Sequence, residues 1–288
     1  MPDSPCIVTA ALTGVLTDPQ RHPVPVTPAE MGAAARQAQD AGATVVHIHF
    51  RAQAPGMGRF PTWEPAICTE IVDAIRSEAP GVLINSSTGV MGDDISGPEG
   101  CLRAIKPEIA AMNSGSLNYL KARSNGQWAW PPMVFSNSVD KINAFLAVMN
   151  EIGAVPEFEC FDMGIVRSIG LFKKVGMITD PLHVSLVMGV SSGMPARADL
   201  LPILIDEAPE GAHCQSIVIG RQEVWAVHRR MCELGGDVRT GLEDTFYLPD
   251  GSRATQNGQL VDAMVAMVRE CGREPATLEQ TRAAYGLS

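Results

Sequence analysis

The chain has 288 residues, of which 45% are hydrophobic and 19% charged, a composition typical of a globular protein with one sizeable domain. Its net charge of −10 argues against nucleic acid as a partner, because few basic residues are left to neutralise phosphates. No apolar run in the sequence reaches the ~18 residues that a membrane-spanning helix needs.

The seven cysteines are scattered and contain no CxxC pair. This predicts reduced thiols and argues against a disulfide framework or a cysteine-based zinc site. The first residues, MPDSP, lack the basic region of a signal peptide. We therefore expect a cytoplasmic protein.

Strand-like and helix-like segments alternate along the chain. Thr27, Pro28 and Glu30 have the spacing of a helix start, with an N-cap, a proline at the first helical position and a glutamate at N3. The run 44–51 is apolar and β-branched, which predicts a buried strand. Similar patterns predict strands at about 6–12, 82–88, 108–113, 155–161, 182–188, 214–219 and 237–241, and helices at about 28–40, 64–78, 98–105, 138–152, 164–175, 198–207, 222–234 and 257–272.

Eight strands that are each followed by a helix indicate a (β/α)8 TIM barrel, an α/β fold of about 250 residues. We predict a single domain over residues 1–288, with an irregular excursion at about 121–137 and a short C-terminal helix at 277–285. An open doubly wound sheet is the alternative. It usually has five or six strands, and no GxGxxG opens a helix in this chain.

His47 and His49 lie two residues apart in a predicted strand, so their side chains point to the same side. They are near the C-terminal end of that strand, where barrel enzymes carry their chemistry. Catalytic zinc usually has three protein ligands and one open position, and Glu243 is the best candidate for the third ligand. The alternative is a pair of core histidines that bond to their neighbours.

Other polar residues also follow strand ends. Arg239 would keep Asp244 ionised, so that Asp244 can act as a base near a metal-bound carbonyl, although a loop ion pair is the alternative. Gly220 and Arg221 open a helix after the seventh strand, where barrels often bind phosphate, and a CoA or nucleotide phosphate could dock there. We expect His183 to face the barrel floor and to have a structural role.

Several segments are distinctive when they are taken together. They are TAALTG (9–14), PVTP (25–28), AGATVVHIHFR (41–51), STG (87–89), MNSGSLN (112–118), PEFE (156–159), GR (220–221) and RTGLED (239–244). In this order they resemble the β-keto acid cleavage enzymes, the family of the 3-keto-5-aminohexanoate cleavage enzyme. The resemblance runs from about residue 6 to the C-terminus.

This resemblance implies a zinc-bearing (β/α)8 barrel, commonly a homotetramer, which converts a β-keto acid and acetyl-CoA into acetoacetate and a new acyl-CoA. It implies that His47, His49 and Glu243 are the zinc ligands and that Asp244, paired with Arg239, is the base. The substrate-binding residues that it implies are Ser87, Thr88, Gly89, Ser116 (where a threonine is familiar), Asn118, Glu159 and the residue at position 16, and acetyl-CoA would contact Gly220 and Arg221.

In the reaction that the family implies, zinc polarises the keto group and Asp244 removes a proton from the carbon between the keto and carboxyl groups. The carbanion attacks acetyl-CoA, CoA moves to the other carbonyl, and a retro-Claisen step releases acetoacetate. Members that act on the amino-substituted keto acid carry an acidic residue where Leu16 stands. We therefore expect the far end of the substrate to be uncharged or apolar, although Asp18 could supply the missing charge.

Two other functions remain open. Metal-dependent hydrolases of the amidohydrolase kind also have HxH on a barrel strand, but on the first strand, and they need a metal-bridging lysine or histidines in mid-barrel. A non-catalytic, metal-stabilised barrel that only binds a keto acid is the other alternative.

Overall fold

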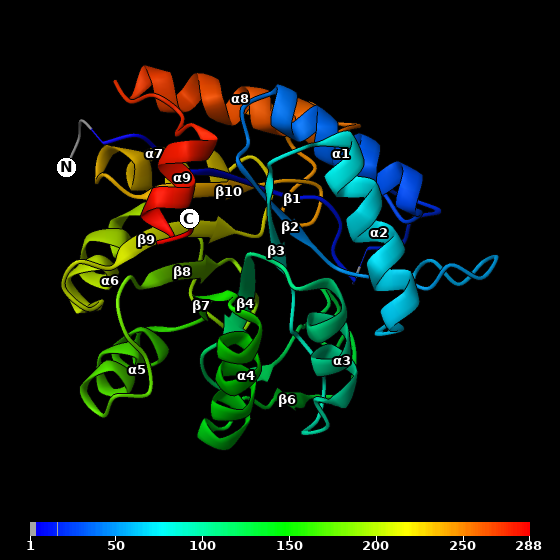
Figure 1. Cartoon of the computed structure of the whole chain (residues 1–288). Coiled ribbons are helices and arrows are strands. Elements are labelled where there is room, and N and C mark those ends of the chain that lie inside the picture. Colours follow the sequence, from blue (N-terminus) through cyan, green and yellow to red (C-terminus); the bar gives the residue numbers. More distant parts are fainter. Residues whose placement is uncertain (1–3, 16) are drawn as a thin grey trace.

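The computed structural model describes residues 4–15 and 17–288, which form a closed barrel of parallel strands surrounded by helices (Figure 1). The strand order around the barrel is β1-β10-β9-β8-β7-β4-β3-β2, so the first and last strands pair and close the cylinder. This confirms the predicted (β/α)8 barrel over the open sheet. The barrel strands are β1 (Val8–Ala11), β2 (Val45–Ile48), β3 (Leu83–Ser86), β4 (Ile109–Asn113), β7 (Val155–Cys160), β8 (His183–Met188), β9 (His213–Val218) and β10 (Asp237–Thr240).

A helix follows each barrel strand and packs on the outside of the cylinder (Figure 1). These helices are α1 (Pro28–Asp40), α2 (Pro65–Glu78), α3 (Ser96–Ile105), α4 (Val139–Ile152), α5 (Met163–Lys174), α6 (Leu201–Glu207) with the 3-10 turn η1 (Ala198–Leu200) before it, α7 (Val224–Glu233) and α8 (Asn257–Glu270). Within the described ranges, none of the helices has the length and apolar character that crossing a membrane requires.

Helix α1 begins as the sequence predicts. The Thr27 hydroxyl accepts a hydrogen bond from the Glu30 amide at 3.3 Å, and the Glu30 carboxylate accepts one from the Thr27 amide at 2.9 Å. This reciprocal capping box satisfies two amide groups that the helix itself cannot bond.

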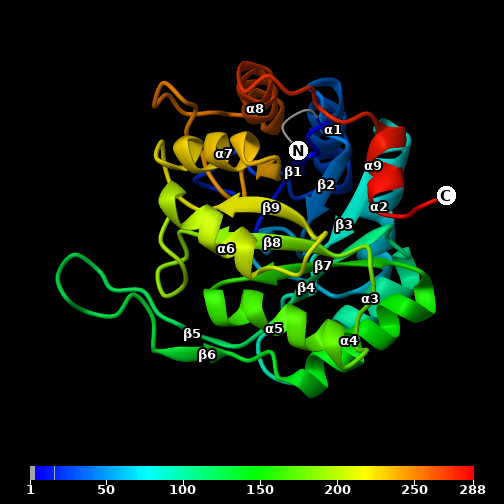
Figure 2. The same cartoon turned by 90° about the vertical axis from the view of Figure 1, so that its left-hand side faces the viewer.

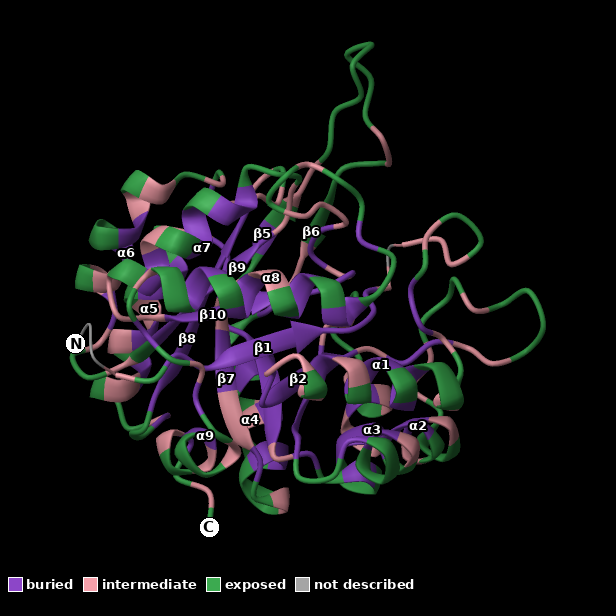
Figure 3. Cartoon of the chain, turned by 90° about the horizontal axis from the view of Figure 1, so that it is seen from above, coloured by how far each residue is buried: buried purple, intermediate pink, exposed green. Residues whose placement is uncertain are grey.

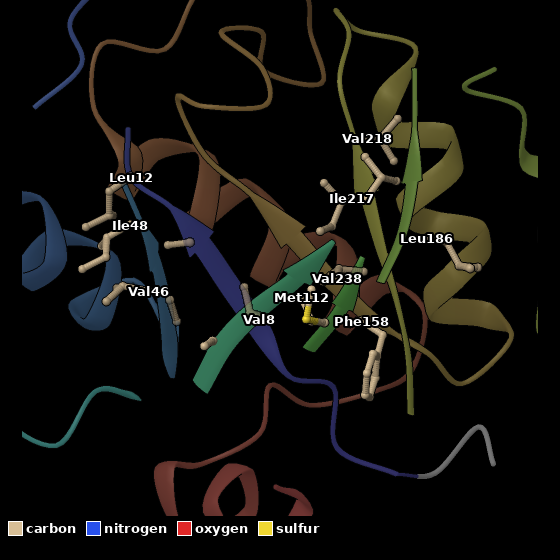
Figure 4. Close-up of a cluster of buried hydrophobic side chains, with 14 of the residues drawn as sticks. Val8, Leu12, Val46, Ile48, Met112, Phe158, Leu186, Ile217, Val218 and Val238 are labelled. Atoms are coloured by element: carbon tan, nitrogen blue, oxygen red, sulfur yellow. The ribbon is translucent and has the colours of Figure 1, made fainter. Parts of the chain in front are cut away.

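The main apolar core lies between the strands and the helices. On β2, Val46 and Ile48 belong to this core and point away from the barrel axis (Figure 4). Because side chains alternate along a strand, His47 between them faces the barrel interior. The outer faces of the strands therefore provide the packing, and the inner faces are free to carry polar groups.

A smaller apolar cluster closes the barrel at the N-terminal ends of the strands. Ile7, Val45, Leu83 and Ile109 pack there with Tyr285, which directly follows the last helix, α9 (Leu278–Ala284). We call this cluster the floor of the barrel, and the opposite end, where the strands finish, the mouth.

The predicted irregular excursion contains a two-stranded antiparallel hairpin. Its strands are β5 (Leu117–Tyr119) and β6 (Met133–Phe135), and the loop between them projects from the barrel (Figure 2). Most of this loop is exposed (Figure 3), and Trp128 within it is 52% exposed. The hairpin starts shortly after β4, so its base lies at the mouth.

One expectation about the cysteines was wrong. A disulfide joins Cys68 of α2 to Cys101 of α3, whereas the sequence predicted reduced thiols. The two cysteines are 33 residues apart and become neighbours only because α2 and α3 pack side by side. The five other cysteines are free.

Candidate metal centre and active site

The mouth brings together residues that are far apart in the sequence. His47 lies in β2, His49 directly follows it, and Glu243 lies in the loop after β10, with only β1 between the two strands. Gly241 makes this approach possible. It has a φ of +149°, and a Cβ there would lie 2.1 Å from the carbonyl oxygen of Ala11, so no other residue fits without rearrangement. The Glu243 amide then donates to the same carbonyl at 3.3 Å, and its side chain faces the two histidines.

His47, His49 and Glu243 have the spacing of a metal site. The Nε2 atoms of His47 and His49 lie 3.6 and 3.3 Å from Oε1 of Glu243. Ligands at the usual distances from tetrahedral zinc are about 3.3 Å apart, so a divalent cation fits among these atoms. Among the described residues, Oε2 of Glu243 is buried without a hydrogen-bond partner. Buried polar atoms rarely lack a partner, and a bound cation would supply one. The residues present therefore fit a zinc-type ion.

The electrostatic environment favours the protonation states that metal ligands need. Burial alone would raise the pKa of Glu243, but His49, Arg239 and His47 together hold it far below its ordinary value. Burial lowers the pKa of His47 well below the usual range, and Arg239 acts in the same direction. An ionised carboxylate and a neutral imidazole are the forms that bind a cation.

His47, His49 and Glu243 are called the metal-type cluster below. Arg239 connects this cluster to two further carboxylates. Its guanidinium bonds to Glu243 (Nη2 to Oε1, 2.6 Å), to both oxygens of Asp244 (3.0 Å each) and to Glu159 (Nη1 to Oε1, 3.3 Å). The side chain is 2% exposed, so these ion pairs are shielded from water. Burial raises the pKa of Asp244 to about 7 and that of Glu159 to about 7, while Arg239 acts against both shifts. A carboxyl group whose pKa is near 7 is well matched to proton transfer at neutral pH.

The predicted substrate-binding residues after β3 have different surroundings. The Ser87 hydroxyl accepts a hydrogen bond from the Gly89 amide at 3.3 Å. The Thr88 hydroxyl donates to the carbonyl oxygen of Ala111 at 2.5 Å, so this side chain ties the end of β3 to β4. Asn113 lies near Gly89: a Cβ added at Gly89 would be 3.8 Å from the side-chain Nδ2 of Asn113.

Ser116 and Asn118 lie at the base of the hairpin. The Ser116 hydroxyl accepts a hydrogen bond from the Asn137 amide at 2.7 Å. Ser116 and Asn118 also line a cavity of about 400 Å³ together with Asp162 and Ser192. Leu16, the position that the sequence connects with the far end of the substrate, lies outside the described residues.

Gly220 and Arg221 lie beside the loop that carries Asp244. The Gly220 amide donates to the Asp244 carbonyl at 3.2 Å. The guanidinium of Arg221 lies 5.6 Å from the centre of the Tyr247 ring, and that of Arg253 lies 5.9 Å from the same centre. Sequence reasoning missed Arg253, because no short-range spacing connects it with Arg221.

Two buried polar residues near the histidines were also missed as parts of the site. Arg51 donates from Nε to the Thr13 hydroxyl at 2.9 Å, and its Nη1 bonds to the carbonyl of Gly58 at 3.0 Å, so it holds two mouth loops together. Asn85 is fully buried in β3 and pairs in register with His47. The alternation along β3 could have identified Asn85, because a polar side chain at an inward position needs a partner inside the barrel.

This chain is similar to several known proteins. A family model described as beta-keto acid cleavage enzyme matches residues 5–287. A protein of Cupriavidus necator named 3-oxoadipate:acetyl-CoA acetyltransferase is 33% identical over 98% of this chain and 95% of its own length. A 3-keto-5-aminohexanoate cleavage enzyme of Fusobacterium nucleatum is 31% identical over 98% of this chain and 97% of its own length. Among solved structures, the apo structure of ObcA has a TM-score of 0.69 at 20% identity, covering 92% of this chain and 65% of that one, which supports the fold alone.

Proposed function

Because this chain belongs to the β-keto acid cleavage enzymes, as its sequence predicted, we propose that it catalyses a zinc-dependent condensation of a β-keto acid with acetyl-CoA. The products are acetoacetate and a new acyl-CoA, and the enzyme is an acyl-CoA-forming transferase. The observation that carries the proposal is the convergence of His47, His49 and Glu243 beside an arginine-held carboxylate, Asp244. The family match favours this function over a hydrolase or a non-catalytic binding protein.

His47, His49 and Glu243 would hold the zinc ion at the mouth. When bound there, a divalent cation supplies Lewis-acid chemistry, polarising the keto group and stabilising the negative charge that develops on its oxygen. Three protein ligands would leave room for substrate oxygens, because a catalytic zinc site keeps a position open. Zinc suits this mixed nitrogen and oxygen donor set.

Asp244 is the proposed base. It would accept a proton from the substrate carbon between the keto and carboxyl groups, the most acidic carbon of a β-keto acid bound this way. Arg239 donates two hydrogen bonds to Asp244, so the carboxylate is held in a single orientation next to Glu243. With a pKa raised to about 7 by burial, Asp244 is a stronger base than an exposed aspartate and is still partly ionised at neutral pH.

The β-keto acid is proposed to lie between the metal-type cluster and the hairpin base. Ser87 and Gly89 would contact its carboxylate, and Ser116 and Asn118 would line the cavity for the rest of the molecule. Thr88 would support the end of β3 through its bond to Ala111. Glu159 would act through Arg239. We keep the prediction that the far end of the substrate is uncharged or apolar.

Acetyl-CoA is proposed to dock on the neighbouring loops. Gly220 and Arg221 would receive a phosphate of CoA, and Arg253, which lies near the same Tyr247 ring as Arg221, would supply a second cation. The bond from the Gly220 amide to the Asp244 carbonyl ties this surface to the base, so that a thioester could reach the substrate. A phosphate between two guanidinium groups gains charge-assisted hydrogen bonds.

Metal analysis combined with a CoA-dependent assay tests the proposed function. Purified protein should carry about one zinc per chain and should form acetoacetate only when both a β-keto acid and acetyl-CoA are present. The keto-acid panel should include 3-oxoadipate, 3-keto-5-aminohexanoate and an unsubstituted 3-oxo acid. Turnover without acetyl-CoA, or a preparation that is active without a divalent metal, would contradict the proposal. A clear preference for the amino-substituted acid or for 3-oxoadipate, which are both charged at the far end, would contradict only the expectation that this end is uncharged or apolar.

Three further features stay predictions. They are the single-domain organisation of residues 1–288, the homotetramer and the cytoplasmic location. Sedimentation of the purified protein tests the second of them directly.

A further inference from the structure

The inner face of the barrel below the metal-type cluster is polar. Asn85 in β3 and Glu157 in β7 both face the interior and are 0% and 1% exposed. Asn85 pairs in register with His47 on the neighbouring strand, so the amide lies beside the imidazole. Glu157 is on the same side of β7 as Glu159, one layer closer to the floor.

These buried groups have unused hydrogen-bonding capacity. Among the described residues, Nδ1 of His47, both polar atoms of the Asn85 amide and Oε1 of Glu157 make no hydrogen bond of standard geometry. Buried polar atoms are rarely left without partners in native proteins, and such a cluster requires an explanation. The mutual arrangement of the three side chains supplies one.

The neighbours of Asn85 indicate how its amide is oriented. Nδ1 is the buried atom of His47 that lacks a partner, and Asn85 is the residue in register beside it, so an amide oxygen turned towards the ring can accept from Nδ1–H. Oε1 of Glu157 also lacks a partner, and Asn85 acts to lower the pKa of this carboxyl group, as a nearby amide donor would. One orientation satisfies both neighbours, with Oδ1 towards His47 and Nδ2 towards Glu157.

Glu157 also has a partner at the floor of the barrel. The Tyr285 hydroxyl donates to Oε2 of Glu157 at 3.1 Å, and Tyr285 is itself packed in the floor cluster. The carboxylate is therefore anchored from below by a residue that follows α9. His47 and Asn85 therefore lie side by side nearer the mouth, and Glu157 and Tyr285 are bonded to each other nearer the floor.

We propose that Asn85 is a positioning residue which fixes the tautomer of His47, and that Glu157 and Tyr285 orient Asn85. With Nδ1–H directed at Asn85, the lone pair of His47 is on Nε2, the atom that lies 3.6 Å from Glu243. The opposite tautomer would place a proton on Nε2 and block the binding of a cation. Partners behind a metal-binding histidine set its tautomer and ring orientation in this way. This inference rests on the proposed metal site but concerns a different part of the barrel.

The first test measures the tautomer in metal-free, full-length protein by ¹⁵N NMR of the histidine side chains, with His47 assigned from a His47→Gln variant. The wild type should show protonated Nδ1 and unprotonated Nε2 at neutral pH. Asn85→Leu, which is nearly isosteric but offers no acceptor, should give a mixture of tautomers. A wild-type Nε2–H tautomer, or an unchanged Asn85→Leu spectrum, overturns the proposal. This readout needs no bound metal, so it gives an answer even if the proposed function is wrong.

The second test measures the zinc dissociation constant by competition with a chelator. Asn85→Leu should weaken zinc binding by about 10- to 100-fold, the usual effect of losing a partner behind a metal ligand. The matched control is Thr9→Val, because the Thr9 hydroxyl is also buried inside the barrel and has no hydrogen-bond partner within the described ranges. Zinc affinity in the control should stay at the wild-type value. An equal loss in Thr9→Val would mean that any change to the barrel interior weakens the site, and would overturn the assignment.

A double variant provides rescue and guards against a folding failure of Asn85→Leu. Asn85→Asp combined with Glu157→Gln keeps one carboxylate, restores an acceptor beside His47 and reverses the donor between the two positions. It should show the wild-type tautomer of His47 and zinc affinity within about threefold of the wild type. An Nε2–H tautomer in this variant would overturn the proposal without reference to Asn85→Leu.

Discussion

Two pairs of histidines lie at opposite ends of the same barrel and have different surroundings. At the mouth, the rings of His47 and His49 are 5.1 Å apart and both face Glu243. At the floor, His183 stacks on His213 with ring centres 4.8 Å apart, and its Nε2 lies 3.2 Å from the carbonyl oxygen of Ala284. The first pair is arranged as ligands, whereas the second contributes to packing, as the sequence predicted for His183.

Burial does not explain this difference. It lowers the pKa of His183 to about 3 and also lowers the pKa of His47 well below its ordinary value. What differs is the neighbour, because Glu243 supplies an ionised oxygen at the mouth, whereas Tyr285 covers His183 with a ring 3.7 Å away at the floor. A carboxylate that converges on two imidazoles from another element gives the mouth pair, His47 and His49, an arrangement that could hold a metal ion.

Removing that carboxylate should have the largest effect. Glu243→Gln keeps the shape of the side chain but removes its charge, so we expect zinc affinity to fall by more than about a hundredfold and activity to be lost. His183→Phe, in the floor pair, is the matched control and should keep about one zinc per chain. Metal content after dialysis and competition titration measure both variants. Full zinc occupancy in Glu243→Gln would remove the distinction between the two pairs.

Asp244→Asn separates the proposed base from the metal ligands. The amide cannot accept the substrate proton, so we expect kcat to fall by about 10²- to 10⁴-fold while zinc content stays near that of the wild type. Steady-state kinetics with saturating acetyl-CoA and metal analysis of the same sample provide the measurement. Loss of zinc together with activity would indicate that Asp244 supports the metal site and does not act as the base.

The approach of Glu243 to His47 and His49 depends on Gly241, where the loop after β10 passes close to the Ala11 carbonyl. Gly241→Ala should lower the free energy of unfolding by more than about 1 kcal/mol and reduce zinc content, because the new Cβ meets the Ala11 carbonyl. Gly153→Ala is the control: it also has a positive φ, of +75°, but an added Cβ there would meet nothing within 4 Å. It should cost about 1–2 kcal/mol through backbone strain alone and leave zinc content unchanged. Urea unfolding and metal analysis check both variants, and equal zinc contents would show that this approach tolerates the change.

His183 at the floor should make a pH-dependent contribution to stability. Folded His183 stays neutral down to about pH 3, whereas an unfolded histidine binds a proton near pH 6.5. Its contribution is therefore fully present above about pH 6.5 and is lost as the pH falls towards 3, by about 1.4 kcal/mol per pH unit. His183→Phe should reduce the slope of unfolding free energy against pH between 6 and 4. An identical slope in the variant would indicate that His183 is protonated in the folded barrel.

Local pattern was sufficient for most of the fold. The capping box at Thr27 identifies the start of α1, and the β-branched run around His47 identifies β2. Both signals involve residues that are close together in the sequence, so they can be recognised without the tertiary structure. The hairpin at Leu117–Phe135 was expected only as an irregular excursion, because its strands are three residues long and pair across a long loop. The Cys68–Cys101 disulfide was missed because it depends on which helices are neighbours.

The sequence by itself determined the alternation of strands and helices, the placement of His47 and His49 on one side of a strand, and the family, because periodicity and short motifs are properties of neighbouring residues. Only the tertiary structure decided that Glu243 reaches those histidines across β1, that Arg239 connects three carboxylates, and that Asn85 and Glu157 lie behind His47. These relations join residues on different strands. Distances between strands are set when the barrel closes, and spacing along the chain does not encode them.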